Sequence, residues 1–116
     1  HGTGTYFSLD WSYTGSFKND MKDGSGTQTY SNGDEYNGEF KEEMFSGKGN
    51  FKYSNGSHYV GEYANNLFNG YGVMVFPDGN KYEGMWKDGT YHGEGKFTFS
   101  DGRTIEGEWI NGKVKE

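Results

Sequence analysis

The sequence predicts an all-β fold: a single elongated, twisted antiparallel sheet of consecutive β-hairpins, with about nine or ten short strands. Glycine supplies 21 of the 116 residues, and aromatic residues make up 19%. A glycine inside a helix costs about 1 kcal/mol relative to alanine, whereas aromatic side chains favour strands. Besides the glycine content and the aromatic content, glycines and aromatic residues recur at a fixed interval, which is typical of stacked identical units. We therefore expect essentially no helix.

The repeat has a period of 23 residues. Positions that are equivalent in successive repeats are here called a column. One column is aromatic at Tyr13, Tyr36, Tyr59 and Tyr82 and continues at Ile105. Glycines follow the same step, and one glycine column contains Gly26, Gly49, Gly72 and Gly95. The period divides a single domain, residues 1–116, into four complete units between two partial ones. The units are residues 1–12, 13–35, 36–58, 59–81, 82–104 and 105–116.

Each unit contains a turn, and the first hairpin should turn differently from the others. In the leading fragment Asp10 occupies the column that holds glycine elsewhere, and the spacing from Gly4 to Tyr13 is one residue shorter than in the next unit. The later turns are predicted to be tight, because Asn-Gly and Asp-Gly accept the left-handed backbone that such turns need. In chain order they are Asn32-Gly33, Asn55-Gly56, Asp78-Gly79 and Asp101-Gly102.

The turn between Phe97 and Ile105 fixes the register of the strands. A two-residue loop would put the aromatic residues of the two strands on opposite faces. A three-residue loop closed by Gly102 in the left-handed conformation pairs Phe97 with Ile105 on one face. Applied to the whole repeat, this register predicts further facing pairs. They are Phe51 with Tyr59, Met74 with Tyr82, Gly26 with Gly38, Gly49 with Gly61, Gly72 with Gly84, and Gly95 with Gly107.

This register gathers the apolar residues on one face. A ring lying over two facing glycines covers bare backbone and buries about 150 Å², worth several kcal/mol at about 25 cal/mol per Å². That gain exceeds the glycine cost of about 1 kcal/mol. The sequence offers no second layer, so the sheet should curl over its own rings, dimerise or accept a partner. The other face should be polar, with Glu39, Glu62, Lys96, Thr98, Glu106 and Glu108.

Charge and composition exclude several classes of function. The net charge of −6 argues against nucleic acid as a partner. The absence of cysteine removes thiolate chemistry and favours a cytoplasmic location. The histidines His1, His58 and His92 fall at different points of the repeat, so they give no metal-ligand spacing. No Gly-x-Gly element continues into a phosphate-binding loop. We expect no catalytic residue, no cofactor and no metal.

One unit carries a recognisable motif. From Tyr82 to Gly95 it reads Tyr-Glu-Gly-Met-Trp-Lys-Asp-Gly-Thr-Tyr-His-Gly-Glu-Gly, which resembles the MORN (membrane occupation and recognition nexus) repeat, Tyr-x-Gly-x-Trp-x-x-Gly-x-x-His-Gly-x-Gly. The resemblance covers nearly the whole chain, which begins and ends in mid-unit, as expected of a fragment of a longer array. The motif has glycine at the position of Gly89, but three other units have a different residue at that position. The residues there are Asp20, Glu43 and Asn66.

The resemblance implies a scaffold or adaptor in cytoskeletal, membrane-proximal or signalling assemblies, and some members of the family are described as phospholipid binders. Our leading hypothesis is a noncatalytic scaffold whose aromatic groove and apolar loops bind an amphipathic helix or extended peptide of a protein partner, or a second copy in a homodimer. The loop residues could instead seal the core. The candidate partner-binding residues are Tyr36, Phe40, Met44, Phe45, Tyr59, Tyr63, Leu67, Phe68, Tyr82, Trp86, Tyr91 and Trp109.

Two other functions stay open. Basic residues near the loops and turns could bind phospholipid headgroups at a membrane surface, although the net negative charge of the chain opposes such binding. The array could also be a regulatory appendage of an enzyme outside this fragment. The basic residues in question are Lys18, Lys41, Lys81, Lys87 and Arg103.

Overall fold

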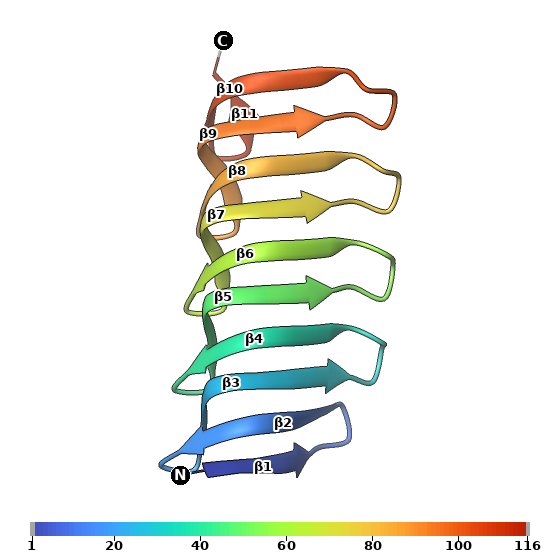
Figure 1. Ribbon diagram of the computed structural model, residues 1–116. Coiled ribbons are helices and arrows are strands. Elements are labelled where there is room, and N and C mark those ends of the chain that lie inside the picture. Colours follow the sequence, from blue (N-terminus) through green and yellow to red (C-terminus); the bar gives the residue numbers. More distant parts are fainter. Residues whose placement is uncertain (1, 116) are drawn as a thin grey trace.

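The computed structural model describes residues 2–115 and shows the predicted all-β fold, one open antiparallel sheet without a helix (Figure 1). Eleven strands lie side by side in chain order within these residues, one more than the upper number expected. The molecule measures 49 × 24 × 16 Å. The strands are β1 (Gly2–Phe7), β2 (Trp11–Lys18), β3 (Met21–Tyr30), β4 (Glu35–Lys41), β5 (Met44–Lys52), β6 (His58–Ala64), β7 (Leu67–Val75), β8 (Lys81–Lys87), β9 (Thr90–Thr98), β10 (Thr104–Ile110) and β11 (Lys113–Val114).

The turns at one end of the hairpins, here called the tip loops, have the predicted three-residue form. In the last of them the N–H of Phe99 donates to the carbonyl of Arg103 at 2.7 Å, and Gly102 takes a φ of 95°. Phe97 consequently faces Ile105, which confirms the register. The predicted facing pairs of glycines are all present.

The first hairpin turns differently, as predicted. The N–H of Ser8 donates to the carbonyl of Trp11 at 2.7 Å, so only Leu9 and Asp10 lie between the bonded residues. A loop shorter by one residue agrees with the shorter spacing in the leading fragment.

The turns at the other margin of the sheet, here called the margin turns, link one unit to the next. In each, two consecutive residues have positive φ, as in the type I′ turn that suits twisted hairpins. Asp20, Glu43 and Asn66 adopt the same left-handed conformation as Gly89. The departures from the repeat motif therefore leave the turn conformation unchanged. The margin turns are 19–20, 42–43, 65–66, 88–89 and 111–112.

The margin turn at Glu42 is expected to contain removable strain. Glu42 has a φ of 49°, a conformation that costs most side chains about 1 kcal/mol and that asparagine tolerates better. Asparagine holds the equivalent position in three other units. Glu42→Asn should therefore raise the free energy of unfolding by about 0.5 kcal/mol, as measured by urea denaturation. Glu35→Asn, in the extended strand β4, should give no gain, and equal gains would contradict the strain argument.

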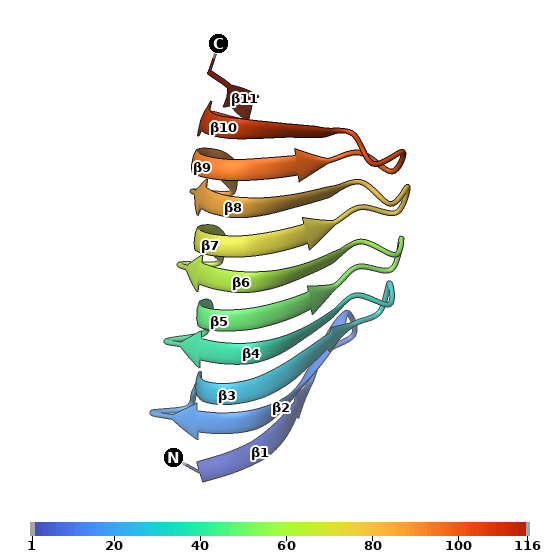
Figure 2. The same ribbon diagram turned by 45° about the horizontal axis from the view of Figure 1, so that its top comes forward.

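The sheet curls over its own inner face, which is the face that carries the aromatic residues. A register shift interrupts the pairing of four strand pairs, for example between Gly61 and Tyr63 in the pairing of β6 with β7. Beyond each shift the chain turns behind the sheet, as the left margin of Figure 2 shows. Of the three ways expected to cover the aromatic face, the monomer therefore uses curling, at least along this margin.

Four covering tyrosines, Tyr13, Tyr36, Tyr59 and Tyr82, are fully buried on the inner face. The ring of Tyr59 lies over Gly72, where an added Cβ would come within 2.6 Å of two ring atoms. The hydroxyl of Tyr59 donates to the carbonyl of Glu62 at 2.8 Å. The facing glycines thus accommodate the rings, as predicted.

The curled margin places a second aromatic layer on these rings. Phe68 stacks on Tyr59 with ring centroids 3.9 Å apart and an interplanar angle of 19°, and Trp86 meets the same tyrosine edge-on at 5.5 Å. Offset and edge-on contacts of this kind add about 1 kcal/mol each beyond the area that they bury. The equivalent stacked pairs are Tyr36 with Phe45 and Tyr82 with Tyr91.

The opposite face, here called the outer face, is only partly as predicted. The predicted polar residues lie there, and Glu62 and Glu106 are exposed. Its centre, however, carries exposed or half-exposed apolar side chains from β6 to β8. The prediction of a polar face rested on the charged columns alone, so it missed these side chains. They are Val60, Tyr71, Val73, Val75 and Met85.

Candidate functional site

Seven of the twelve predicted partner-binding residues are buried in the monomer, with at most 6% of their surface exposed. They form the floor of the inner face and are covered by the curled margin. Their contact with a partner stays a prediction, and in this structure they form the core cluster with one another. The seven residues are Tyr36, Phe40, Tyr59, Tyr63, Tyr82, Trp86 and Trp109.

The other five predicted residues lie nearer the surface. Met44, Phe45, Phe68 and Tyr91 are half-buried, and Leu67 is 46% exposed. The three aromatic residues among them, Phe45, Phe68 and Tyr91, stack on the covering tyrosines. For these three, the interpretation that loop residues seal the core holds. Leu67 remains available to a partner.

Two apolar hollows lie side by side along the inner face, and together we call them the inner groove. The first has a volume of about 170 Å³ and the second about 320 Å³. They share Phe68 and Gly89 in their walls. The first is lined by Phe45, Phe51, Tyr53, Tyr63, Asn66, Leu67, Phe68 and Gly89. The second is lined by Phe68, Met74, Phe76, Trp86, Gly89, Thr90, Tyr91 and Gly112.

The two hollows are the same site in successive units. Every residue of the second wall lies 23 positions after a residue of the first, as Phe76 does after Tyr53 and Trp86 after Tyr63. One unit adds two strands, so the hollows recur about every 10 Å along the sheet. A partner that fills both must present apolar groups at that interval.

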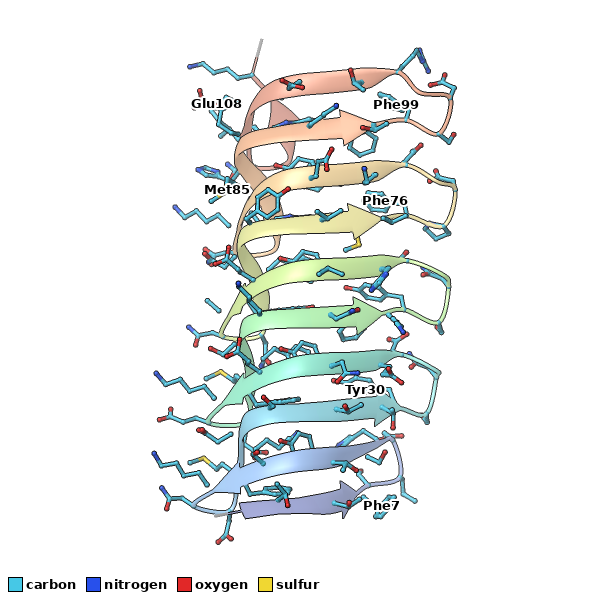
Figure 3. The ribbon with its side chains drawn as sticks, viewed as in Figure 1. Phe7, Tyr30, Phe76, Met85, Phe99 and Glu108 are labelled. Atoms are coloured by element: carbon cyan, nitrogen blue, oxygen red, sulfur yellow. The ribbon has the colours of Figure 1, made fainter. Side chains whose placement is uncertain are left out.

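The groove wall near the tip loops was missed by the sequence-based prediction. It comes from a column that begins at Tyr30 and continues at Tyr53, Phe76 and Phe99, again at intervals of 23 residues. Figure 3 labels three of these side chains, which lie one above another at the same side of the sheet. They are half-buried, and the ring centroid of Tyr53 lies 4.5 Å from that of Phe51. The period shows that these positions are equivalent, but not that they border the groove.

The first complete unit departs from the groove pattern through Lys22, which occupies the column of Phe45 and Phe68. The Lys22 ammonium is buried over the ring of Trp11, 4.3 Å from its centroid, and donates to Gln28 Oε1 at 3.2 Å. Burial lowers the pKa of Lys22, and the carboxylate of Glu43 opposes that shift. The N-terminal end of the inner face is therefore closed by a polar cluster instead of an aromatic stack.

Tyr63 is the polar residue of the groove floor. Its side chain is 5% exposed, and its hydroxyl has no hydrogen-bond partner within residues 2–115. Burial is the main reason that its pKa is raised. At the equivalent position Trp86 donates its indole N–H to the carbonyl of Gly72 at 3.1 Å. Both units therefore have an aromatic ring at this position. The polar group of the ring forms a hydrogen bond in Trp86 but not in Tyr63.

Two kinds of feature are absent from residues 2–115. No group of three histidine or acidic side chains there is arranged to hold a metal ion. No helix in that range is long and apolar enough to cross a membrane.

The repeat matches a known family model along most of the chain. The model described as MORN repeat matches five consecutive segments, residues 13–35, 36–58, 59–81, 82–102 and 106–113. These segments hold the covering tyrosines and both walls of the inner groove. No curated protein matches the chain.

Proposed function

Because the chain belongs to the MORN-repeat family, whose members serve as protein-interacting or membrane-interacting modules, we propose that its inner groove binds an amphipathic helix of a partner protein. The role is that of a noncatalytic scaffold or adaptor. The observation that carries the proposal is the pair of equivalent apolar hollows, one unit apart.

The interval between the hollows suits a helix. Seven residues of an α-helix rise about 10.5 Å, close to the interval of about 10 Å between successive units. A helix with apolar residues repeating every seven positions would therefore place one apolar group in each hollow. An extended peptide would need an apolar residue at every third position instead, and its bound conformation distinguishes the two.

Charge favours a basic partner. The chain carries a net charge of −6, and three tip loops contribute carboxylates at Asp34, Asp78 and Asp101, the last of which is paired with Arg103. Opposite charge accelerates association and favours the correct partner over acidic competitors. The polar face of the helix should accordingly be rich in lysine or arginine. The same charge disfavours an anionic membrane.

The test is a titration of the domain with a synthetic amphipathic peptide that has leucine at heptad positions and lysine on its polar face. Binding should be seen by calorimetry, with a gain of helical circular dichroism. Leu67→Lys places a charge in the wall of the first hollow at an exposed position, so the fold should survive. We expect Leu67→Lys to weaken binding at least about tenfold, since burying an unpaired charge costs more than about 1.4 kcal/mol.

The matched control is Leu9→Lys, which makes the same change at a fully exposed residue of the first hairpin, outside the groove. It should leave the affinity for the peptide unchanged. Equal effects of the two substitutions, or no binding at all, would contradict the proposal. Anionic lipid vesicles at about 0.1 M salt should not displace the peptide, and displacement would favour the lipid-binding alternative.

A further inference from the structure

The unit before the first hollow has the same wall positions, but three of them carry different polar residues. Lysine, glutamine and glutamate stand there one period before phenylalanine, phenylalanine and asparagine of the first hollow. Other wall positions keep their character, as Tyr30 does for Tyr53 and Met44 for Leu67. We call the three replaced residues the polar trio. They are Lys22, Gln28 and Glu43.

The members of the polar trio are bonded to one another. The ammonium of Lys22 donates to Gln28 Oε1 at 3.2 Å and lies 3.9 Å from Glu43 Oε1. The backbone N–H of Lys22 donates to the carboxylate of Glu43. Lys22 and Gln28 are both buried, and a buried polar group without a partner is costly. Each replacement therefore depends on the other two.

The carboxylate of Glu43 borders the path of a helix that extends along the inner groove. In the next unit the side chain of Asn66 accepts the N–H of Phe45 at 2.8 Å and lines the first hollow. Glu43 accepts the N–H of Lys22 in the same way, so its carboxylate lies one unit before that wall. The side chain of Glu43 is 45% exposed, and a carboxylate can accept several hydrogen bonds. It is therefore accessible to a partner.

The polar trio distinguishes one binding register from the others. Because the hollows repeat, a helix with leucine at every heptad position could otherwise bind one unit nearer to the N-terminus. A leucine beside the trio would cover the carboxylate of Glu43 and remove its water without a replacement hydrogen bond. A lysine or arginine at that place would donate to the carboxylate. A single polar residue in an apolar seam fixes the register of coiled coils in the same way.

We propose, on the basis of the helix binding proposed above, that the polar trio ends the inner groove on its N-terminal side and selects the partner. The selected helix has apolar residues at two successive heptad positions and a lysine or arginine at the third. That cation binds the carboxylate of Glu43, which makes Glu43 a specificity-determining residue. The contact also sets the direction in which the helix lies along the sheet.

The test is calorimetric titration of the whole chain with amphipathic peptides that have leucine at two successive heptad positions and either lysine or leucine at a third. The third position lies at the N-terminal end of the helix in one pair of peptides and at the C-terminal end in the other. In the pair whose third residue reaches Glu43, the lysine peptide should bind at least about fivefold more tightly than the leucine peptide.

Glu43→Asn installs the residue that the next unit has at this position, Asn66, so the fold should be retained. The preference for lysine in that pair should fall below about twofold, because the asparagine carries no charge. The matched control is Glu42→Asn, which removes the same charge one residue away and installs the residue of Asn65. Residues equivalent to Glu42 line neither hollow, so the control should keep the preference.

A second variant replaces the whole trio with its counterparts from the next unit, combining Lys22→Phe, Gln28→Phe and Glu43→Asn. It leaves no buried ammonium unpaired, and it should reverse the preference to about tenfold in favour of leucine, which then fills a further apolar hollow. A peptide with two leucines and no third residue measures the groove alone, and all variants should bind it. Failure of the wild-type chain to bind that peptide would overturn both proposals. Retained binding with the same lysine preference in wild type, Glu43→Asn and the triple variant would overturn only the role of the trio.

Discussion

Gly72→Ala is expected to lower the free energy of unfolding by about 3 kcal/mol or more, because overpacking a rigid core is costly. A Cβ at Gly72 would collide with the hydroxyl oxygen of Tyr59 and lie 2.6 Å from two of its ring atoms. The ring cannot move aside, since it is fully buried, stacked on Phe68 and hydrogen-bonded to the carbonyl of Glu62. Urea denaturation followed by circular dichroism measures the loss.

Gly4→Ala is the matched control for this steric effect. Gly4 also faces a glycine, Gly15, across a hairpin. A Cβ at Gly4 would meet the ring of Phe17 at an ordinary contact distance of 3.4 Å. The substitution should change the free energy of unfolding by less than about 1 kcal/mol. Similar losses for both variants would show that glycine is needed for its backbone, and not to accommodate the tyrosine ring.

Raising the pH above about 10 is expected to unfold the domain cooperatively between about pH 11 and 12. Burial raises the pKa of Tyr82 to about 12 and shifts the pKa of Tyr36, Tyr59 and Tyr63 in the same direction. A tyrosine whose pKa is raised by folding stabilises the native state fully below the unfolded value of about 10. That stability is lost as the pH rises from about 10 toward the folded pKa.

The size of the alkaline effect follows from linkage. Above about pH 10 each such tyrosine lowers the free energy of unfolding by about 1.4 kcal/mol per pH unit. Four of them lower it by more than about 5 kcal/mol per pH unit, which is comparable with the whole stability of a small domain. Lys22 acts in the opposite direction, because its lowered pKa makes the native state relatively more stable as the pH rises toward 10.5. One lysine does not offset four tyrosines. Loss of strand signal should coincide with a cooperative rise in phenolate absorbance beyond that of the exposed Tyr71.

Tyr63→Phe tests the origin of the alkaline transition. It removes a hydroxyl that has no hydrogen-bond partner within residues 2–115, so it should raise the midpoint pH without lowering stability at neutral pH. Tyr59→Phe also removes a titrating group, but it costs about 1 kcal/mol at neutral pH through the lost bond to the carbonyl of Glu62. Ionisation of the buried tyrosines Tyr36, Tyr59 and Tyr82 near the ordinary tyrosine pKa, with the strands intact, would contradict the linkage.

The parts of the fold that could be predicted depend on local chemistry repeated many times. The pairing of Phe97 with Ile105 followed from one tip loop, because only a loop closed by Gly102 put both side chains on one face. Applying the same register to every repeat then predicted the facing pairs of glycines. The left-handed turn at Glu42 and Glu43 could not be predicted in this way, since glutamate has no preference for that backbone and the neighbouring units impose the turn.

The candidate site was predicted less completely than the fold. Its residues lie in the right columns, but periodicity does not say whether Phe68 covers the face of Tyr59 or points toward solvent. That choice depends on the register shift after Gly61, which bends the margin behind the sheet. The residues of the wall near the tip loops, Tyr53 and Phe76, obey the same period but were not among the predicted partner-binding residues, because the period does not show which aromatic positions border a hollow.

The edge-on contacts between neighbouring units have a consequence for cooperativity. Tyr36 touches Tyr63, and Tyr59 touches Trp86, so each unit is held by the rings of the next. With contacts limited to neighbours, the chain behaves as a one-dimensional lattice in which total stability is a sum of unit and interface terms. Opening then starts at the outermost hairpins and travels inward, and amide hydrogen exchange should be slowest in the central units.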